Sequence, residues 1–151
     1  MTSTRSTNRS LSPGAVIPEV PYSEPLVAAA WLCRAFGFRE RLRIFAHRVQ
    51  ILVGDGSLVV VEPPAGVSAR DCGHRLMIPV ADVDAHAARA EREGARIVSA
   101  PADQPFGERQ YTAEDFAGQR WTFTQTIADV DPASWGGEMI AETDSARPTD
   151  R

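Results

Sequence analysis

The pentapeptides Val20-Pro21-Tyr22-Ser23-Glu24 and Ile78-Pro79-Val80-Ala81-Asp82 open two segments of the same design. An alanine-rich run follows each pentapeptide, from Leu26 to Phe36 in the first segment and from Val83 to Glu93 in the second, and a glycine ends each run. The offset between the two copies is 58 residues at the pentapeptide and 57 residues at the glycine. Self-similarity at a nearly constant spacing indicates a duplicated supersecondary unit.

Each alanine-rich run is predicted to be a helix. In the first copy Ser23 can cap the helix, Pro25 is tolerated in its first turn, and Gly37 ends it. In the second copy Asp82 is the expected cap and Gly94 marks the end. The residues expected to face the core are Leu26, Ala30, Cys33 and Phe36 in the first helix and Val83, Ala87 and Ala90 in the second.

The segments around these helices have the shorter period that is typical of β-strands. One strand is expected before each helix and three strands after it. In the first unit the later strands are predicted at residues 42–44, 49–53 and 58–61, and in the second at 96–100, 108–112 and 121–124. The sequence therefore predicts an α+β fold made of two βαβββ units.

The repeats lie in a single predicted domain, residues 14–128, with its two modules at about 14–66 and 72–128. Residues 1–13 carry almost nothing to bury and are expected to form a disordered arm. The tail, residues 129–151, is also polar, but it contains Trp135, and a tryptophan seldom stays in a tail unless it docks. We expect residues 129–139 to fold back onto the domain and the remainder to be loose.

The composition limits the partners and the location of this chain. A formal net charge of -4 and a pI near 5.4 argue against nucleic-acid binding, which needs clustered lysine and arginine. No apolar run approaches the roughly 20 residues that span a bilayer, so we expect no membrane partner. The first residues lack the apolar core of a signal peptide, and two cysteines are too few for a disulfide framework. A cytoplasmic location is therefore expected.

Two of the tryptophans and two of the histidines give simpler expectations. Trp31 is expected at the boundary of helix and sheet, and Trp121 should be a core residue because of the alternation along the last strand. His47 precedes a predicted strand, and His86 lies off the apolar stripe of the second helix. Both histidines are therefore expected to face solvent.

Two segments add a family resemblance to the repeat. They are Leu32-Cys33-Arg34-Ala35-Phe36-Gly37-Phe38 at the end of the first helix, and Phe106-Gly107-Glu108-Arg109-Gln110-Tyr111 with Gly118-Gln119-Arg120-Trp121 near the end of the second unit. Together with the βαβββ order, they resemble the vicinal oxygen chelate (glyoxalase/bleomycin resistance/dioxygenase) superfamily. More narrowly, residues 14–127 are similar to small bacterial bleomycin-resistance-like proteins. The resemblance implies a curved, half-open barrel shaped like a cup, and a homodimer, which would also cover exposed sheet edges.

Metal-dependent members of this superfamily hold a divalent ion with His, Gln or Glu side chains from the first and last strands of each unit. The matching positions in this sequence carry Ile17, Arg75, Thr122 and either Val61 or Glu62. Isoleucine and arginine do not supply the donors that bind such ions, and threonine is a weak ligand. We therefore expect neither a metal nor another cofactor.

The residues expected to face a ligand follow partly from alternation along the strands and partly from the ligand positions that the resemblance implies, which give Glu62 and Thr122. Counting back from Val80 puts Pro79, Met77 and Arg75 on the cup side, with Ile78 and Leu76 under the helices. Arg75 can meet Glu19 across the pseudo-two-fold axis or hold an anionic ligand. The candidate ligand-binding residues are Glu19, Gln50, Glu62, Arg75, Met77, Gln110 and Thr122.

Three functions are compatible with this sequence, and whether the chain is an enzyme stays open. The favoured hypothesis is metal-independent binding of a small organic, antibiotic-like molecule. A second hypothesis is a metal-dependent lyase, isomerase or dioxygenase, in which a β-bulge turns His74 into the cup beside Glu19 and Glu62. The third is a non-catalytic dimeric interaction domain in which side chains fill the cup.

Overall fold

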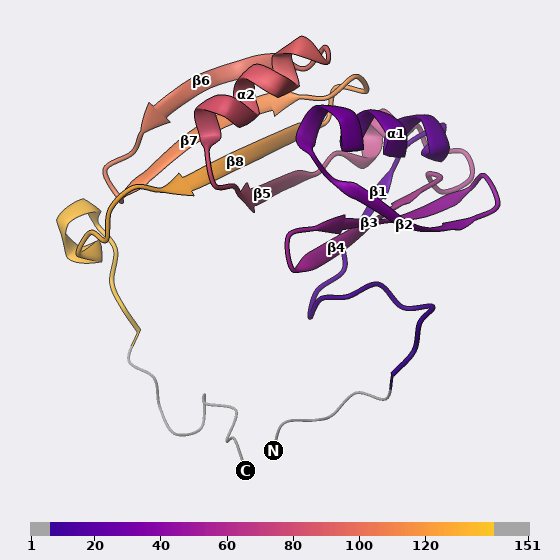
Figure 1. Ribbon diagram of the computed structural model, residues 1–151, viewed down its shortest axis with the longest axis horizontal. Helices are drawn as coiled ribbons and strands as arrows, with labels where there is room; N and C mark the ends of the chain where they lie inside the picture. The colour runs from indigo at the N-terminus through magenta and orange to yellow at the C-terminus, as the bar shows by residue number, and fades with distance from the viewer. Residues whose placement is uncertain (1–6, 141–151) are drawn as a thin grey trace.

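The computed structural model describes residues 7–140, and within them the predicted repeat folds as two four-stranded sheets with one helix each (Figure 1). The first unit consists of β1 (Glu19–Pro21), α1 (Pro25–Phe36), β2 (Arg39–Ile44), β3 (Arg48–Val53) and β4 (Gly56–Val61). The second consists of β5 (Arg75–Pro79), α2 (Val83–Arg92), β6 (Arg96–Asp103), β7 (Glu108–Glu114) and β8 (Arg120–Thr126). The short 3₁₀ helices η1 (Ala69–Cys72) and η2 (Pro132–Trp135) precede β5 and follow β8. The predicted α+β fold of two βαβββ units is confirmed.

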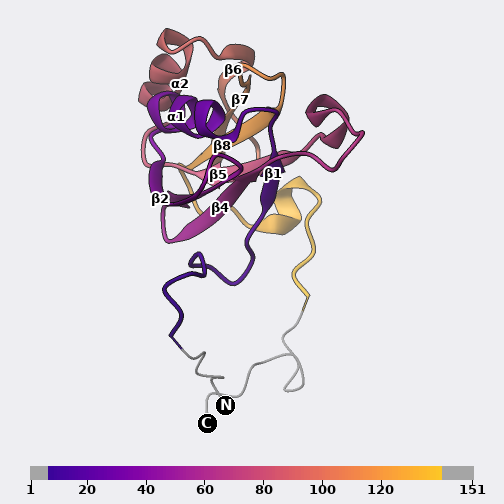
Figure 2. The same ribbon diagram turned by 90° about the vertical axis from the view of Figure 1, so that its right-hand side faces the viewer.

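Both sheets have the same connectivity, with strand orders β1-β4-β3-β2 and β5-β8-β7-β6. The first strand of each unit pairs in parallel with the last one, and the other neighbours are antiparallel. A parallel pair needs a crossover connection, which the helix of each unit begins. Both helices lie on the same side of the two curved sheets, so the opposite face carries no helix (Figures 1 and 2). Among the residues described, no helix is long and apolar enough to cross a membrane.

The helix ends follow local sequence signals, with one exception. Asp82 caps α2 as predicted, because its Oδ1 accepts a hydrogen bond from the Ala85 N–H at 3.1 Å. Gly37 ends α1 in the left-handed conformation, with φ of 77°. The predicted cap at Ser23 is wrong, since Glu24 occupies the cap position and no side chain caps the helix. Pro25 at the first position has no N–H to satisfy, which reduces the need for a cap.

The two helices pack side by side, and each satisfies polar groups at the end of the other (Figures 1 and 2). The last turn of α1 exposes carbonyl groups, and Arg89 of α2 donates from Nε to the carbonyl oxygen of Arg34 at 2.9 Å. In return, Trp31 of α1 donates from Nε1 to the carbonyl oxygen of Glu93 at 2.8 Å. These contacts join residues about sixty positions apart and fix the two units against each other.

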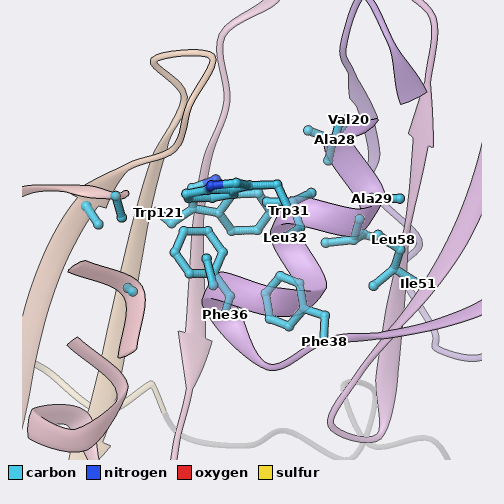
Figure 3. Packing of buried hydrophobic residues seen from close by; sticks show 14 of the residues in the cluster. Val20, Ala28, Ala29, Trp31, Leu32, Phe36, Phe38, Ile51, Leu58 and Trp121 are labelled. Carbon is cyan, nitrogen blue, oxygen red and sulfur yellow. The ribbon is translucent and has the colours of Figure 1, made fainter. Parts of the chain in front are cut away.

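The core continues from one unit into the other through aromatic rings (Figure 3). Phe36 at the end of α1 lies with its ring centre 5.4 Å from Trp121 and 4.8 Å from Phe123, both on β8. Trp31 is 5.3 Å from Phe36 and is also buried, so Trp31 and Trp121 are core residues as expected. The two units therefore share one hydrophobic core within a single chain.

A buried carboxylate, which the sequence did not point out, holds the two units together beside this core. Asp115 lies in the turn between β7 and β8 and accepts hydrogen bonds from the hydroxyl of Tyr22 at 2.5 Å and from Nε1 of Trp121 at 3.0 Å. The backbone N–H groups of Ala117 and Gln119 also donate to it. Burial, and then the charge of Asp115, raise the pKa of Tyr22 far above its ordinary value, so its hydroxyl stays protonated and donates.

The prediction that His86 faces solvent is wrong. Its side of α2 packs against α1 and the sheet, and Nε2 donates to the carbonyl oxygen of Phe36 at 2.9 Å. Because a carbonyl only accepts, Nε2 carries the proton, and Nδ1 accepts from the hydroxyl of Tyr111. His47 is exposed, as expected.

The two half-buried histidines, His74 and His86, predict that the protein loses stability in mild acid. Burial lowers the pKa of His86 and of His74 below the ordinary value of 6.5. Between that value and the lower folded-state pKa, the unfolded chain binds more protons than the folded one, so the free energy of unfolding falls as the pH decreases below about 6.5. Urea unfolding at pH 7.5 and pH 5.5 measures the loss.

The matched variants for this prediction are His86→Gln and His47→Gln. The first should reduce the difference in unfolding free energy between the two pH values, because it removes a group that titrates differently in the two states. The second replaces an exposed histidine in the turn between β2 and β3 and serves as the control. If the free energy of unfolding of the wild type is higher at pH 5.5 than at pH 7.5, the two histidines do not have the lowered pKa values assigned to them.

Both segments outside the repeats contact the sheets. The carbonyl oxygen of Ser10 accepts a hydrogen bond from Nε2 of Gln50 at 2.8 Å, and that of Pro13 accepts one from the hydroxyl of Ser57 at 2.5 Å. The part of the expected disordered arm that is described, residues 7–13, thus lies against β3 and β4. After β8, Trp135 packs on Phe106 with ring centres 5.3 Å apart. The rest of the arm, residues 1–6, and the part of the tail expected to be loose, residues 141–151, lie outside the described residues.

Candidate functional site

The helix-free face of the second sheet carries four of the predicted ligand-binding residues. Leu76 and Ile78 on β5 pack against the core, while Arg75 and Met77 are exposed, so the alternation predicted from the sequence is confirmed. Met77 pairs in register with Thr122 on β8. The register also puts Gln110 of β7 opposite Thr124 of β8. The fourth of these candidates, Arg75, lies at the start of β5.

Polar side chains next to Met77 form a connected network on β7 and β8. Gln110 donates from Nε2 to the hydroxyl oxygen of Thr124 at 3.1 Å, and that hydroxyl donates to Glu108 at 2.6 Å. Hydrogen bonds from Thr124 and Thr126 hold the pKa of Glu108 below its usual range. The hydroxyls of Thr112 and Thr122 lie 3.1 Å apart. The Gln110–Thr124–Glu108 network and the separate Thr112–Thr122 pair thus orient Gln110 and Thr122 beside an exposed thioether.

In the first sheet, two predicted site residues are engaged within the chain. Glu19 and Gln50 lie in one row, because both pair with Val59 on β4. Glu19 binds Arg48 at 3.1 Å, so the predicted meeting of Glu19 with Arg75 does not occur. The side-chain oxygen of Gln50 accepts a hydrogen bond from Arg41, and its nitrogen donates to the N-terminal arm.

Glu62 lies apart from the other candidates. It borders a separate hollow at the start of α1, together with Ser23, Leu26, Val27 and Ala46. The strand pattern that selected Glu62 ends with β4 at Val61, so alternation no longer determines its direction. The candidate set is therefore not brought together as a whole.

The residues at the family's metal positions do not fit a divalent ion. Arg75 and Thr122 occupy two of them on the second sheet, and neither supplies a suitable donor set. The alternative ligand His74 packs edge-on against Trp121, 4.8 Å between ring centres, and β5 pairs with β8 without a bulge. Across residues 7–140, no three His, Cys, Asp or Glu side chains gather as a metal site.

A largely apolar hollow of about 300 Å³ lies between the two sheets, and we call it the apolar hollow. One wall is Leu76–Pro79 on β5, the edge strand of the second sheet. The other wall consists of Val16 and Pro18 before β1, and of the turn and first residues of β4 up to Leu58. Figure 1 shows β5 as the strand of the second sheet that lies nearest the first sheet, and the residues that line this hollow come from both units.

The sequence did not identify most of this lining. Met77 is the only predicted ligand-binding residue among the residues that border the apolar hollow. No signal in the sequence pointed to Val16, which lies in the apolar stretch 15–18, and only the structure shows that this side chain is 79% exposed. A large exposed apolar residue is more informative than a buried one.

Comparison with known proteins agrees with this architecture. The family model of the Glyoxalase/Bleomycin resistance protein/Dioxygenase superfamily matches residues 20–123. A search of curated proteins found no match. The crystal structure of TioX from Micromonospora sp. ML1 is 30% identical and has a TM-score of 0.64, covering 78% of this chain and 100% of TioX.

Two solved structures from Streptomyces sp. CB03234 are also similar. One is TnmS3, described as an antibiotic binding protein, which is 25% identical with a TM-score of 0.61 over 73% of this chain and 93% of TnmS3. The other is a glyoxalase/bleomycin resistance protein, 26% identical with a TM-score of 0.57 over 72% of this chain and 97% of its own. The shared βαβββ repeat and the match over most of the domain show that this chain belongs to the glyoxalase/bleomycin resistance protein/dioxygenase superfamily.

Proposed function

We propose that this chain binds a small, largely apolar organic molecule of the antibiotic-like class, without a metal ion. The observation that carries the proposal is the apolar hollow of about 300 Å³ between β5 and the start of β4. Ligand pockets in proteins are commonly of this size, mainly apolar, and equipped with a few polar groups that orient the ligand. The similarity to TnmS3, described as an antibiotic binding protein, supports the same class of ligand.

In this proposal Met77 makes the central contact with the ligand. It is 61% exposed although it is apolar, and it borders the apolar hollow. Methionine is flexible and polarizable, which suits contacts with varied organic molecules. Gln110 lies beside it, with Nε2 at 3.9 Å from the sulfur, and can offer a hydrogen bond to the ligand. Thr122, in register with Met77, would add a second polar contact.

The metal-dependent alternative is less well supported. It requires Glu19, His74 and Glu62 to converge on one ion, but Glu19 binds Arg48 and His74 packs against Trp121. Glu62 borders a different hollow. The alternative of a non-catalytic interaction domain expects a cup filled by side chains, and the presence of the apolar hollow argues against it.

The test is native mass spectrometry of the purified protein with bleomycin and a panel of small, apolar, aromatic antibiotics, followed by titration of any compound that binds. We expect saturable binding of at least one compound. Met77→Arg should weaken that binding by about tenfold or more, because a charge in an apolar pocket must be desolvated when the ligand binds. Phe45→Arg is the matched control, since Phe45 is 86% exposed in the turn between β2 and β3.

The proposal is rejected if no compound of the panel binds, or if Met77→Arg binds as tightly as the wild type does. Metal analysis of the same sample checks the metal-independence, which a stoichiometric ion would contradict. A homodimer is part of the proposal, because β1, β2, β5 and β6 are edge strands of the two described sheets. Light scattering of that sample at micromolar concentration should give the mass of two chains.

A further inference from the structure

A row of charged side chains crosses the second sheet where β5 and β8 begin. Arg75 on β5 pairs in register with Arg120 on β8. Arg120 in turn pairs with Glu114 on β7, and Glu114 pairs with Arg96 on β6. Side chains that are directly opposite on neighbouring strands lie on the same face of a sheet. The row therefore contains three arginines and one carboxylate on the helix-free face.

The carboxylate of this row is already engaged by other arginines. Glu114 accepts hydrogen bonds from Nε and Nη2 of Arg96 at 3.0 and 2.7 Å. Nε of Arg120 lies 3.5 Å from the same carboxylate. Within residues 7–140, the guanidinium of Arg75 has neither a hydrogen bond nor an ion pair. Two like charges directly opposite each other are destabilising in a sheet, so Arg75 beside Arg120 is unfavourable without a counter-ion.

Arg75 and Arg120 border a hollow of about 320 Å³ at the ends of these strands, which we call the basic hollow. Arg70 from η1 also borders it. A Cβ added to Gly118 would lie 3.9 Å from Nη2 of Arg70, so this guanidinium lies over the turn between β7 and β8. Three arginines from three separate segments therefore border one open space.

Buried hydrogen bonds hold the base of the basic hollow in place. Gln119, which is 4% exposed, donates from Nε2 to the carbonyl oxygen of Ala69 at 3.1 Å and accepts from the N–H of His74 at 3.2 Å. One side chain thus ties η1 to the start of β5 and to the turn before β8. The arginines are presented from backbone segments that are fixed relative to one another.

The nearby carboxylates do not neutralise this site. Asp115 is buried behind the turn, and its oxygens accept hydrogen bonds from Tyr22, Trp121 and two backbone N–H groups. Asp71, next to Arg70, is exposed and does not border the basic hollow. The bordering arginines therefore carry three positive charges, and of these three only the guanidinium of Arg120 forms an ion pair with a carboxylate among residues 7–140.

We propose that the basic hollow is a binding site for a doubly charged oxyanion, the phosphate monoester group of a small molecule. The planar guanidinium fork matches the oxygens of such a group and forms charge-assisted hydrogen bonds with them. Two negative charges offset the excess that Arg70 and Arg75 bring to the site. The hollow lies at the opposite end of β5 from the apolar hollow, and the proposal does not depend on the function proposed above.

Isothermal titration calorimetry with inorganic phosphate, at pH 7.5 and constant ionic strength, tests this site. We expect saturable binding to the wild-type protein, with sulfate competing and acetate binding more weakly because it carries one charge. Arg75→Gln should weaken phosphate binding about tenfold, since it removes one charge-assisted pair. Arg75→Lys keeps the charge but loses the guanidinium fork, so its phosphate affinity should lie between those of the wild type and Arg75→Gln.

Arg43→Gln is the matched control, because Arg43 is an exposed arginine of the first sheet that pairs with Glu40. It should bind phosphate as the wild type does. Circular dichroism establishes that each variant is folded before titration. The proposal is overturned if the wild type shows no saturable phosphate binding up to tens of millimolar. It is also overturned if Arg43→Gln weakens binding as much as Arg75→Gln does, or if acetate binds as tightly as phosphate.

Discussion

Replacement of Asp115 by alanine is expected to lower the free energy of unfolding by about 4 kcal/mol, because it leaves several buried donors without an acceptor. The hydroxyl of Tyr22 and Nε1 of Trp121 both donate to this carboxylate, and neither is exposed to water. Two backbone N–H groups of the turn lose their acceptor as well. Since small domains are stable by only about 5–15 kcal/mol, this one change removes a large part of the total.

Urea unfolding followed by tryptophan fluorescence measures the effect, with Asp71→Ala as the matched control. Asp71 is an exposed aspartate in η1, and its replacement should change the free energy by no more than about 0.5 kcal/mol. Tyr22→Phe removes only one of the four donors and should cost less than Asp115→Ala. If Asp115→Ala is as stable as Asp71→Ala, the carboxylate does not have the structural role assigned to it.

Replacement of Phe36 by alanine is expected to cost about 3 to 5 kcal/mol, the usual range for a large aromatic residue in a core. Phe36 is 2% exposed, and its ring lies within 5.5 Å, centre to centre, of Trp121, Phe123 and Trp31. Its loss leaves a cavity at the place where α1 meets the second sheet (Figure 3). The variant therefore weakens the contact between the two units as well as the core itself.

Phe45→Ala provides the comparison for this variant, since it deletes the same side chain at a position that is 86% exposed. The control should unfold at nearly the wild-type urea concentration. A Phe36→Ala protein that loses less than about 1 kcal/mol would show that the two units do not depend on this shared core. Light scattering of both variants separates a loss of stability from a change in association.

The repeat and the order of the elements could be predicted because both depend on short-range sequence patterns. Helical spacing of apolar residues, a cap at Asp82 and a glycine after each helix act over a few neighbouring positions. The orientation of β5 was predictable for the same reason, since Leu76 and Met77 must point to opposite faces once the strand forms. The predicted cap at Ser23 failed because the helix begins one residue later than a Ser23 cap requires. Pro25 takes the first helical position, so Glu24 occupies the cap position.

The candidate site was predicted less completely than the fold. Alternation placed Arg75 and Met77 on one face of the second sheet, and the family resemblance added Thr122, but neither said what lies opposite them. Gln50 was correctly placed in a strand, yet its amide is used by the N-terminal arm, a segment whose composition predicts no contact. The apolar hollow depends on how close the edges of the two sheets come, and no single strand encodes that distance.

The sequence by itself determined the duplicated βαβββ unit, the faces of its strands and the unsuitability of the metal positions, because periodicity and side-chain chemistry are local properties. Only the tertiary structure decided which distant groups meet. Tyr22 and Asp115 are 93 positions apart, and His86 reaches the carbonyl oxygen of Phe36 across 50 positions. Such contacts depend on the packing of both helices against each other and against two sheets, and many different pairings are compatible with the same local pattern.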